Sequence, residues 1–243
     1  MIYVVGLGPG EARQTTPWAE QVLERCGVIV GYDAYIDLVR GRFSHKELLS
    51  TPMRRERERC RLALDLALSG KEVALVCSGD PGVYGMAGLL LEMSEGTGVE
   101  IEVVPGVTAA TAAAAVLGAP LMHDFAVISL SDLMTPWDKI LCRLEAAVQA
   151  DFVLCLYNPR SHRRSGHLRT ACQAVMRHRS PETVCGWVRN AGRENQACEV
   201  LTLSALADAE VDMFTTVFIG STETRIVDGR IVTPRGYAVG RRI

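Results

Sequence analysis

The residues best suited to chemistry stand in the segment Ser78-Gly79-Asp80-Pro81, which follows a short apolar run at residues 73–77. The run is too short for a helix and predicts a buried strand that ends in a tight loop at a sheet edge. Small side chains there leave backbone groups and one carboxylate to face a ligand. This set suits a positively charged or hydroxyl-bearing ligand better than a polyphosphate. In an alternative interpretation, Asp80 only caps the following helix.

Three further loops have the same character, with glycine or proline directly after a short apolar run. They are Gly6-Leu7-Gly8-Pro9-Gly10, Pro105-Gly106-Val107-Thr108-Ala109 and Leu156-Tyr157-Asn158-Pro159. In open α/β sheets, ligands bind outside the carboxyl ends of the strands. We therefore expect these loops to converge on one small-molecule site.

The first loop also suggests a dinucleotide site. Gly6 and Gly8 match the start of the dinucleotide-binding fingerprint, and Asp33 stands at about the distance expected for an acid that holds a ribose. However, Glu11 occupies the third glycine position, and Pro9 removes an N–H that could face a pyrophosphate. No Gly-Lys-Ser/Thr follows any of the loops, so a phosphate-binding P-loop is disfavoured. A nicotinamide-dependent oxidoreductase stays open as an alternative.

The elements that must position these loops alternate between strand and helix in the first half of the chain. Strands are expected at residues 2–5, 28–30, 73–77 and 100–104, and helices at residues 18–25, 54–69 and 107–117 and from about residue 86. This alternation predicts a largely parallel α/β sheet. The mixed-sign run at residues 54–59 predicts an exposed helix face.

A break falls near residues 118–124, and a second set of elements follows it. Strands are expected at residues 126–130, 152–157, 184–189, 199–203 and 215–220, an edge strand at 230–232, and helices at 137–150 and 165–177. We therefore predict two α/β domains, residues 1–121 and 122–243, with a cofactor cleft between them.

The composition excludes several functional classes. The net charge of -2 gives no case for nucleic-acid binding. No apolar run approaches the roughly 20 residues that span a bilayer, and no signal peptide is evident, so a cytoplasmic location is expected. The 8 cysteines form no Cys-x-x-Cys pair, so we expect reduced, packed thiols and no metal site.

The loops and the following blocks, in this order, resemble the signature of the tetrapyrrole methylase family, the class III S-adenosylmethionine-dependent methyltransferases. The blocks are Gly6-Leu7-Gly8-Pro9-Gly10, Ser78-Gly79-Asp80-Pro81, Pro105-Gly106-Val107-Thr108-Ala109-Ala110 and Leu117-Gly118-Ala119-Pro120-Leu121. Residues 121–133, 157–161 and 232–237 are similar to family members that act on a corrin precursor. The resemblance runs from the first strand almost to the end of the chain.

The resemblance implies two α/β domains, a homodimer and S-adenosylmethionine as cofactor, with S-adenosylhomocysteine as product. The cofactor contacts that it implies are Pro9, Ser78, Gly79, Asp80, Val83, Thr108, Ala109, Asn158, Asn190 and Ala191. Two of these positions depart from the family pattern. Asn158 stands where many relatives have methionine, and Ala191 stands where some have glycine.

The activity that the resemblance implies is methylation of C17 of precorrin-3B, or of its cobalt-containing counterpart, with ring contraction in cobalamin biosynthesis. Ring contraction invites acid–base help, for which His123, Asp132 and Tyr157 are candidates, with Asp80 as an alternative. Substrate carboxylates could bind Arg160, Arg163 and Arg164, although these could equally form a solvated helix entry. A sister methylase acting at another ring position stays open.

Overall fold

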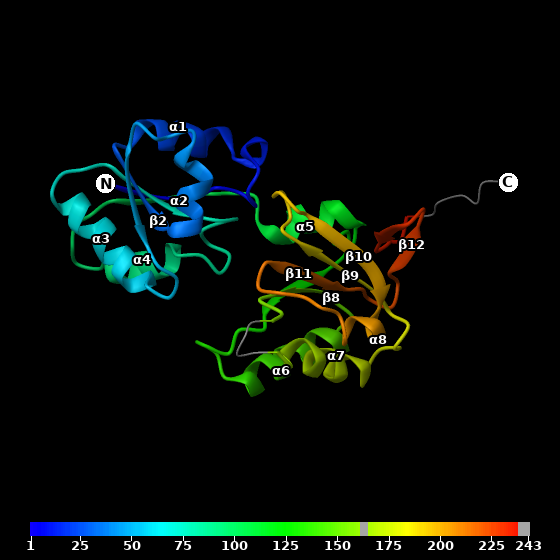
Figure 1. Ribbon diagram of the computed structural model, residues 1–243. Coiled ribbons are helices and arrows are strands. Elements are labelled where there is room, and N and C mark those ends of the chain that lie inside the picture. Colours follow the sequence, from blue (N-terminus) through cyan, green and yellow to red (C-terminus); the bar gives the residue numbers. More distant parts are fainter. Residues whose placement is uncertain (161–164, 238–243) are drawn as a thin grey trace. The chain divides into compact units, whose positions relative to one another are not determined.

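The computed structural model describes residues 1–160 and 165–237. The chain divides into two compact units, Met1–Ala109 and Ala110–Ile243, each of which is considered by itself. Both units combine helices with a sheet, so the α/β class predicted from the sequence is confirmed (Figure 1). Within the described ranges, no helix is long and apolar enough to cross a membrane.

The N-terminal unit is built on a five-stranded sheet in the order β3-β2-β4-β1-β5, and every neighbouring pair is parallel. Its strands are β1 (Ile2–Gly6), β2 (Val28–Tyr32), β3 (Glu47–Thr51), β4 (Val73–Cys77) and β5 (Ile101–Val104). Because β1 lies between β4 and β5, the three loops that follow these strands leave the same edge of the sheet side by side.

Helices cover both faces of this sheet and bury its apolar side chains. On one face, α1 (Pro17–Arg25) and α2 (Asp33–Arg40) pack against Tyr3, Val5 and Val76. On the other face, α3 (Glu56–Leu68) and α4 (Ala87–Met93) pack against Val4 and Leu75. A sheet buried on both faces explains why its central strands read as continuous apolar runs. A short 3-10 helix, Ala12–Gln14, precedes α1.

The sheet of the C-terminal unit has the order β10-β9-β11-β8-β7. Its strands are β7 (Phe125–Ser129), β8 (Val153–Tyr157), β9 (Val184–Arg189), β10 (Ala197–Thr202) and β11 (Thr215–Ile219). β7 and β8 pair in parallel, whereas β11 is antiparallel to both β8 and β9. Consequently β7, β8 and β9 run in the same direction, and their carboxyl ends share one edge.

One face of this second sheet is covered by α6 (Trp137–Gln149), α7 (His167–Met176) and α8 (Leu203–Leu206), as Figure 1 shows for the green and yellow helices below the strands. The other face is covered by α5 (Ala109–Leu117) and by Ile231 of a small sheet. That sheet has the order β12-β13-β6 and consists of β6 (Gly118–Ala119), β12 (Arg225–Val227) and β13 (Arg230–Val232).

Helix α5 is where the observed division differs from the sequence-based one. The prediction placed it in the first domain, before a boundary at residues 121 and 122, whereas the contacts divide the chain after Ala109. The alanine-rich helix packs closely on the C-terminal sheet, where Ala110, Ala113 and Ala114 join Cys155 and Phe218 in one buried cluster.

Two predictions about the N-terminal unit need correction. The sequence analysis missed α2 and β3. It also weighed Asp33 as a ribose-binding acid, but Asp33 follows β2, which β4 separates from β1 and its glycine loop. Arg59 was expected on an exposed helix face but is only 3% exposed. Its Nε donates to Thr51 Oγ1 at 2.8 Å, and its Nη2 donates to the carbonyl of Pro52 at 3.0 Å. These neutral acceptors allow the guanidinium of Arg59 to be buried, and the hydrogen bonds fix the turn after β3.

Candidate functional site

The first two glycine loops of the N-terminal unit are joined directly by backbone hydrogen bonds. Gly8 and Gly79 form an isolated bridge, in which Gly79 N donates to Gly8 O at 2.7 Å and Gly8 N donates to Gly79 O at 3.2 Å. Both glycines have positive φ, 75° and 69°, a conformation that costs glycine little. The predicted meeting of these loops is therefore confirmed within this unit.

The carboxylate of Asp80 joins the third loop to the second. Its Oδ2 accepts from Gly106 N at 3.0 Å, and its Oδ1 accepts from Gly82 N at 2.8 Å. One oxygen thus binds a backbone N–H group of its own loop, and the other binds one of the third loop. The next helix begins only at Ala87, so Asp80 does not cap it, and both carboxylate oxygens hold the loops together.

Glycine is required where these loops cross because their backbones touch. A Cβ added to Gly106 would lie 2.2 Å from Gly79 O, and one added to Gly6 would lie 2.6 Å from Gly106 N. Gly79 differs, because nothing stands within 3.4 Å of the Cβ position there. The backbones of the three loops therefore pack against one another at the carboxyl ends of β1, β4 and β5.

The other predicted cofactor residues of this unit belong to the same three loops. They are Pro9 in the first, Ser78 and Val83 in the second, and Thr108 and Ala109 in the third. No lysine or arginine stands in residues 6–10, 78–83 or 105–109. Backbone groups, small hydroxyls and apolar side chains fit the amino-acid, ribose and adenine parts of S-adenosylmethionine, and they offer no cationic partner for a polyphosphate.

In the C-terminal unit, Tyr157 and Asn158 mark the carboxyl end of β8. The Tyr157 hydroxyl accepts a hydrogen bond from Ala110 N at 2.6 Å and so holds the start of α5. Asn158 has a φ of 53°, in the left-handed region that asparagine tolerates better than most residues. Its Nδ2 donates to Ser129 Oγ, at the end of β7, at 3.0 Å. This geometry suits an asparagine at this position.

Asp132 lies at the same edge, in the loop after β7, and contacts a histidine that the sequence analysis did not select. Its Oδ2 is 3.2 Å from Nε2 of His167, the first residue of α7, without the alignment of a hydrogen bond. The ring centroids of His167 and Trp137 are 4.2 Å apart. The contact between Asp132 and His167 arises from the order of the strands in the sheet. The sequence therefore indicated only that His167 would lie near the start of a helix predicted at residue 165.

The remaining predicted residues of this unit fall into two groups. Asn190 and Ala191 follow β9 and so share the carboxyl edge with Asn158; Asn190 also has a left-handed φ, 52°. Arg160 stands beyond Asn158 and lines a shallow pocket of about 310 Å³ with Arg169 at the start of α7. Arg163 and Arg164 lie outside the described residues.

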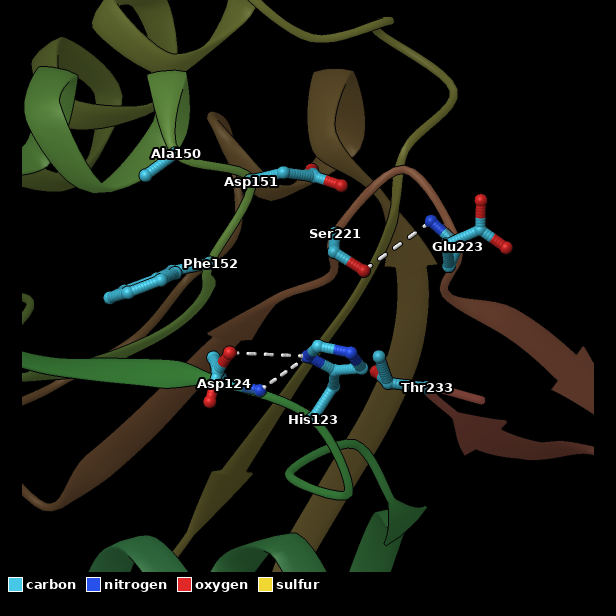
Figure 2. Close-up of a pocket in the computed structure, with 8 residues that line it drawn as sticks. All are labelled: His123, Asp124, Ala150, Asp151, Phe152, Ser221, Glu223 and Thr233. Atoms are coloured by element: carbon cyan, nitrogen blue, oxygen red, sulfur yellow. Dashed lines mark hydrogen bonds and ion pairs between the residues drawn. The ribbon is translucent and has the colours of Figure 1, made fainter. Parts of the chain in front are cut away.

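His123 is separated from the other two acid–base candidates. It precedes β7, whereas Asp132 and Tyr157 stand at or beyond the carboxyl ends of β7 and β8, so the length of a five-residue strand, about 16 Å, lies between them. Its Nδ1 accepts from Asp124 N at 2.8 Å. The pocket beside it, about 130 Å³ and shown in Figure 2, is small for a drug-sized ligand, let alone a macrocycle. Nothing in this placement supports a catalytic role for His123.

Within residues 1–160 and 165–237, no three histidine, cysteine, aspartate or glutamate side chains gather in a way that could hold an ion.

Comparison with known proteins gives matches along almost the whole chain. The family model of the tetrapyrrole (corrin/porphyrin) methylases matches residues 1–207. A probable cobalt-factor III C(17)-methyltransferase of Salmonella typhimurium is 46% identical over 241 residues, which cover 98% of this chain and 100% of that protein. A protein of the same name in Methanocaldococcus jannaschii is 41% identical, covering 98% of both chains. The cobalt-factor III methyltransferase of Priestia megaterium is also 41% identical, but the match covers only 45% of its length.

Solved structures agree with these matches. The crystal structure of the methyltransferase CobJ superposes with a TM-score of 0.89 at 37% identity, covering 96% of this chain and 99% of that one. A uroporphyrin-III C-methyltransferase from Thermus thermophilus, complexed with S-adenosylhomocysteine, has a TM-score of 0.73 at 23% identity and covers 90% of this chain and 96% of that one, which supports the fold alone.

Proposed function

Because the chain belongs to the tetrapyrrole (corrin/porphyrin) methylases, we propose that it methylates C17 of a corrin precursor and contracts the macrocycle in cobalamin biosynthesis. It is a C-methyltransferase, and the proposed substrate is precorrin-3B or its cobalt-containing counterpart. The observation that carries this proposal is the 46% identity to a C(17)-methyltransferase over that relative's full length. The nicotinamide-dependent alternative loses its basis, since β4 lies between β1 and β2, so that Asp33 does not follow the strand beside the first glycine loop.

We propose that the joined loops of the N-terminal unit bind S-adenosylmethionine. Pro9, the Ser78-Gly79-Asp80 turn, Val83, Thr108 and Ala109 are the expected contacts there. The loops offer backbone groups and small hydroxyls but no lysine or arginine, which supports this choice of cofactor. A protein of the same fold is known in complex with S-adenosylhomocysteine. From the C-terminal unit, Asn158, Asn190 and Ala191 are the expected contacts.

When bound, the cofactor supplies an electrophilic methyl group on a sulfonium, which needs neither a metal nor a covalent enzyme intermediate. The task of the protein is then to align the ring carbon with this methyl group and to exclude water. Positioning of this kind can lower a barrier by up to roughly 7–11 kcal/mol in well-oriented systems. The hydrogen bonds between Asp80, Gly82 and Gly106 serve this task by fixing the loops.

The substrate is proposed to bind with its carboxylates near arginine side chains, among which Arg160 lies at the carboxyl edge of β8. Tyr157 remains a candidate acid–base group for ring contraction, although its hydroxyl already accepts from Ala110 N. A homodimer and a cytoplasmic location also remain predictions. Light scattering on the purified protein would test the first.

The experiment that tests the proposal supplies S-adenosylmethionine labelled in its methyl group together with either precorrin-3B or its cobalt-containing counterpart. The expected result is label in the pigment and release of S-adenosylhomocysteine with at least one substrate. Comparison of the two arms identifies the natural form. Absence of label from both pigments, with cofactor binding intact, would contradict the proposal.

A further inference from the structure

The loop between β7 and α6 exposes two consecutive large apolar side chains. Met134 is 94% exposed and Leu133 is 62% exposed. Single exposed apolar residues are common on protein surfaces and need no explanation. This pair is unusual because contacts fix the loop both before and after the two residues, and because the loop directly contacts α7.

Hydrogen bonds fix the start of this loop. Leu130 N donates to the carbonyl of Tyr157 at 2.9 Å, and Ser131 N donates to Ser129 Oγ at 3.2 Å. The same Ser129 Oγ accepts from Asn158, so the loop is tied to the turn after β8. A loop fixed in this way loses little conformational freedom when it binds a ligand.

The pair formed by Asp132 and His167 holds the loop directly before its apolar tip. The imidazole is 3.2 Å from the carboxylate of Asp132, and its centroid is 4.2 Å from that of the Trp137 ring, so one side chain of α7 contacts both the loop and the first residue of α6. Only 20% of the His167 side chain and 37% of the Asp132 side chain are exposed. The backbone directly before Leu133 and Met134 is therefore fixed, while their side chains are exposed.

We propose that Leu133 and Met134 contact the apolar face of the tetrapyrrole and that Asp132 and His167 are positioning residues for this contact. The inference rests on the proposed function. The loop leaves the sheet at the carboxyl edge that also carries Tyr157 and Asn158, the side on which such sheets bind ligands. A flat macrocycle offers a rigid apolar surface, to which the flexible thioether of methionine adapts well.

The test compares the variants Leu133→Ser and Met134→Ser with Ile226→Ser. Ile226 is 54% exposed on β12, so its substitution removes similar apolar surface from a different sheet. Binding of cobalt-factor III is followed through the absorption of the pigment, binding of S-adenosylhomocysteine by calorimetry, and association by light scattering. We expect about tenfold weaker pigment binding for each loop variant, equivalent to about 1.4 kcal/mol. Cofactor binding and association should not change, and Ile226→Ser should behave as the wild type.

A third variant, Asp132→Asn, removes the negative charge beside His167 and retains the shape of the side chain. It is expected to raise the KM for the pigment about fivefold while leaving the affinity for S-adenosylhomocysteine unchanged, which a general loss of structure would not do. Asp132→Glu should restore part of the loss.

Pigment binding within twofold of the wild type in both loop variants would overturn the inference. A change in association without a change in pigment binding would overturn it as well, since the tip would then bind a second copy of the chain. The wild-type protein separates this failure from failure of the proposed function. If it transfers the labelled methyl group normally, only the role of the loop is wrong.

Discussion

At the scale of single residues, polar side chains in both units bind backbone or side-chain partners at the sheet edges that carry the predicted site. Asp80 binds two loops through its carboxylate, and Asn158 adopts a left-handed backbone while its amide reaches β7. Their side chains are therefore expected to affect the cofactor indirectly, by fixing the backbone groups that contact it.

Substitution of Asp80 by asparagine should weaken both folding and cofactor binding. The amide can accept one of the two hydrogen bonds, but its NH2 group would face the N–H of Gly82 or Gly106. We expect a loss of about 2 kcal/mol in the free energy of unfolding, since hydrogen bonds to charged groups contribute about 1.5–3 kcal/mol. Affinity for S-adenosylhomocysteine should fall about tenfold by calorimetry.

The matched control for Asp80 is Asp37→Asn, which removes only an exposed ion pair with Arg40. It should change the free energy of unfolding by less than about 0.5 kcal/mol. Equal behaviour of the two variants would refute the assigned role of Asp80.

For Asn158, alanine and glycine variants separate backbone conformation from the side-chain hydrogen bond. Alanine loses both, and its left-handed conformation costs about 1–2 kcal/mol, whereas glycine loses only the bond to Ser129. Urea unfolding should therefore rank the wild type above Asn158→Gly, and Asn158→Gly above Asn158→Ala. Affinity for S-adenosylhomocysteine should follow the same order.

The control is Asp228→Ala, in the turn between β12 and β13, where φ is 47°. It should destabilise the protein to a similar degree without changing cofactor affinity. The role assigned to Asn158 would be contradicted if its alanine variant were as stable as the wild type.

The cysteines offer a residue-scale test of packing, because six are buried and only Cys142 and Cys198 are exposed. Burial raises the pKa of the Cys26 and Cys77 thiols to about 11, and that of the Cys60 and Cys172 thiols to about 12. Brief alkylation at pH 8 should therefore add two groups to the native protein and eight to the protein in urea, as counted by mass spectrometry. More than two rapid additions to the native protein would contradict the packing.

The same pKa shifts predict how stability depends on pH. A thiol whose pKa is raised by folding retains its proton in the native state, while the unfolded chain releases it near the usual value of 9.0. Above about pH 9 the unfolded state binds fewer protons, so the free energy of unfolding falls as the pH rises. Urea unfolding at pH 8 and pH 10 should show this loss; greater stability at pH 10 would contradict it.

At the scale of elements, three parallel strands bring the N-terminal loops together, and the loops touch through glycine. Gly106→Ala places a Cβ 2.2 Å from Gly79 O, so the loops must separate. We expect a loss of about 1–3 kcal/mol, as for overpacked sites, together with loss of binding to S-adenosylhomocysteine. Thermal unfolding and calorimetry measure the two effects.

Gly88→Ala is the control, because Gly88 lies in α4 with nothing near the added Cβ. This change should raise the free energy of unfolding by up to about 1 kcal/mol, since alanine favours a helix over glycine. If Gly106→Ala were equally benign, the loops would not be packed as described.

Local patterns predicted the elements of the N-terminal site well. The strand at residues 73–77 has the predicted bounds, and the helices predicted at residues 18–25 and 54–69 agree within two residues with α1 and α3. β3 was missed because its strand is half-exposed and mixes polar with apolar residues. The pairing of Asp132 with His167 could not be predicted, because it depends on β8 lying beside β7, a long-range contact that no local pattern encodes.

At the scale of the whole molecule, membership of the tetrapyrrole methylases indicates that the chain is a methyltransferase. The ring carbon that it methylates, C17, is the more specific proposal. The match to C(17)-methyltransferases covers nearly the entire chain, yet other methyltransferases share the fold at lower identity, as the uroporphyrin-III C-methyltransferase does at 23%. The mass of the product would not distinguish C17 from another ring carbon.

The most direct test is therefore to locate the transferred carbon. Cobalt-factor III and precorrin-3B are each incubated with the protein and S-adenosylmethionine that carries ¹³C in its methyl group, and the pigment is examined by NMR. The predicted result is a single enriched methyl group on C17 of a contracted ring. Enrichment at another ring carbon, or none, would contradict the proposed function.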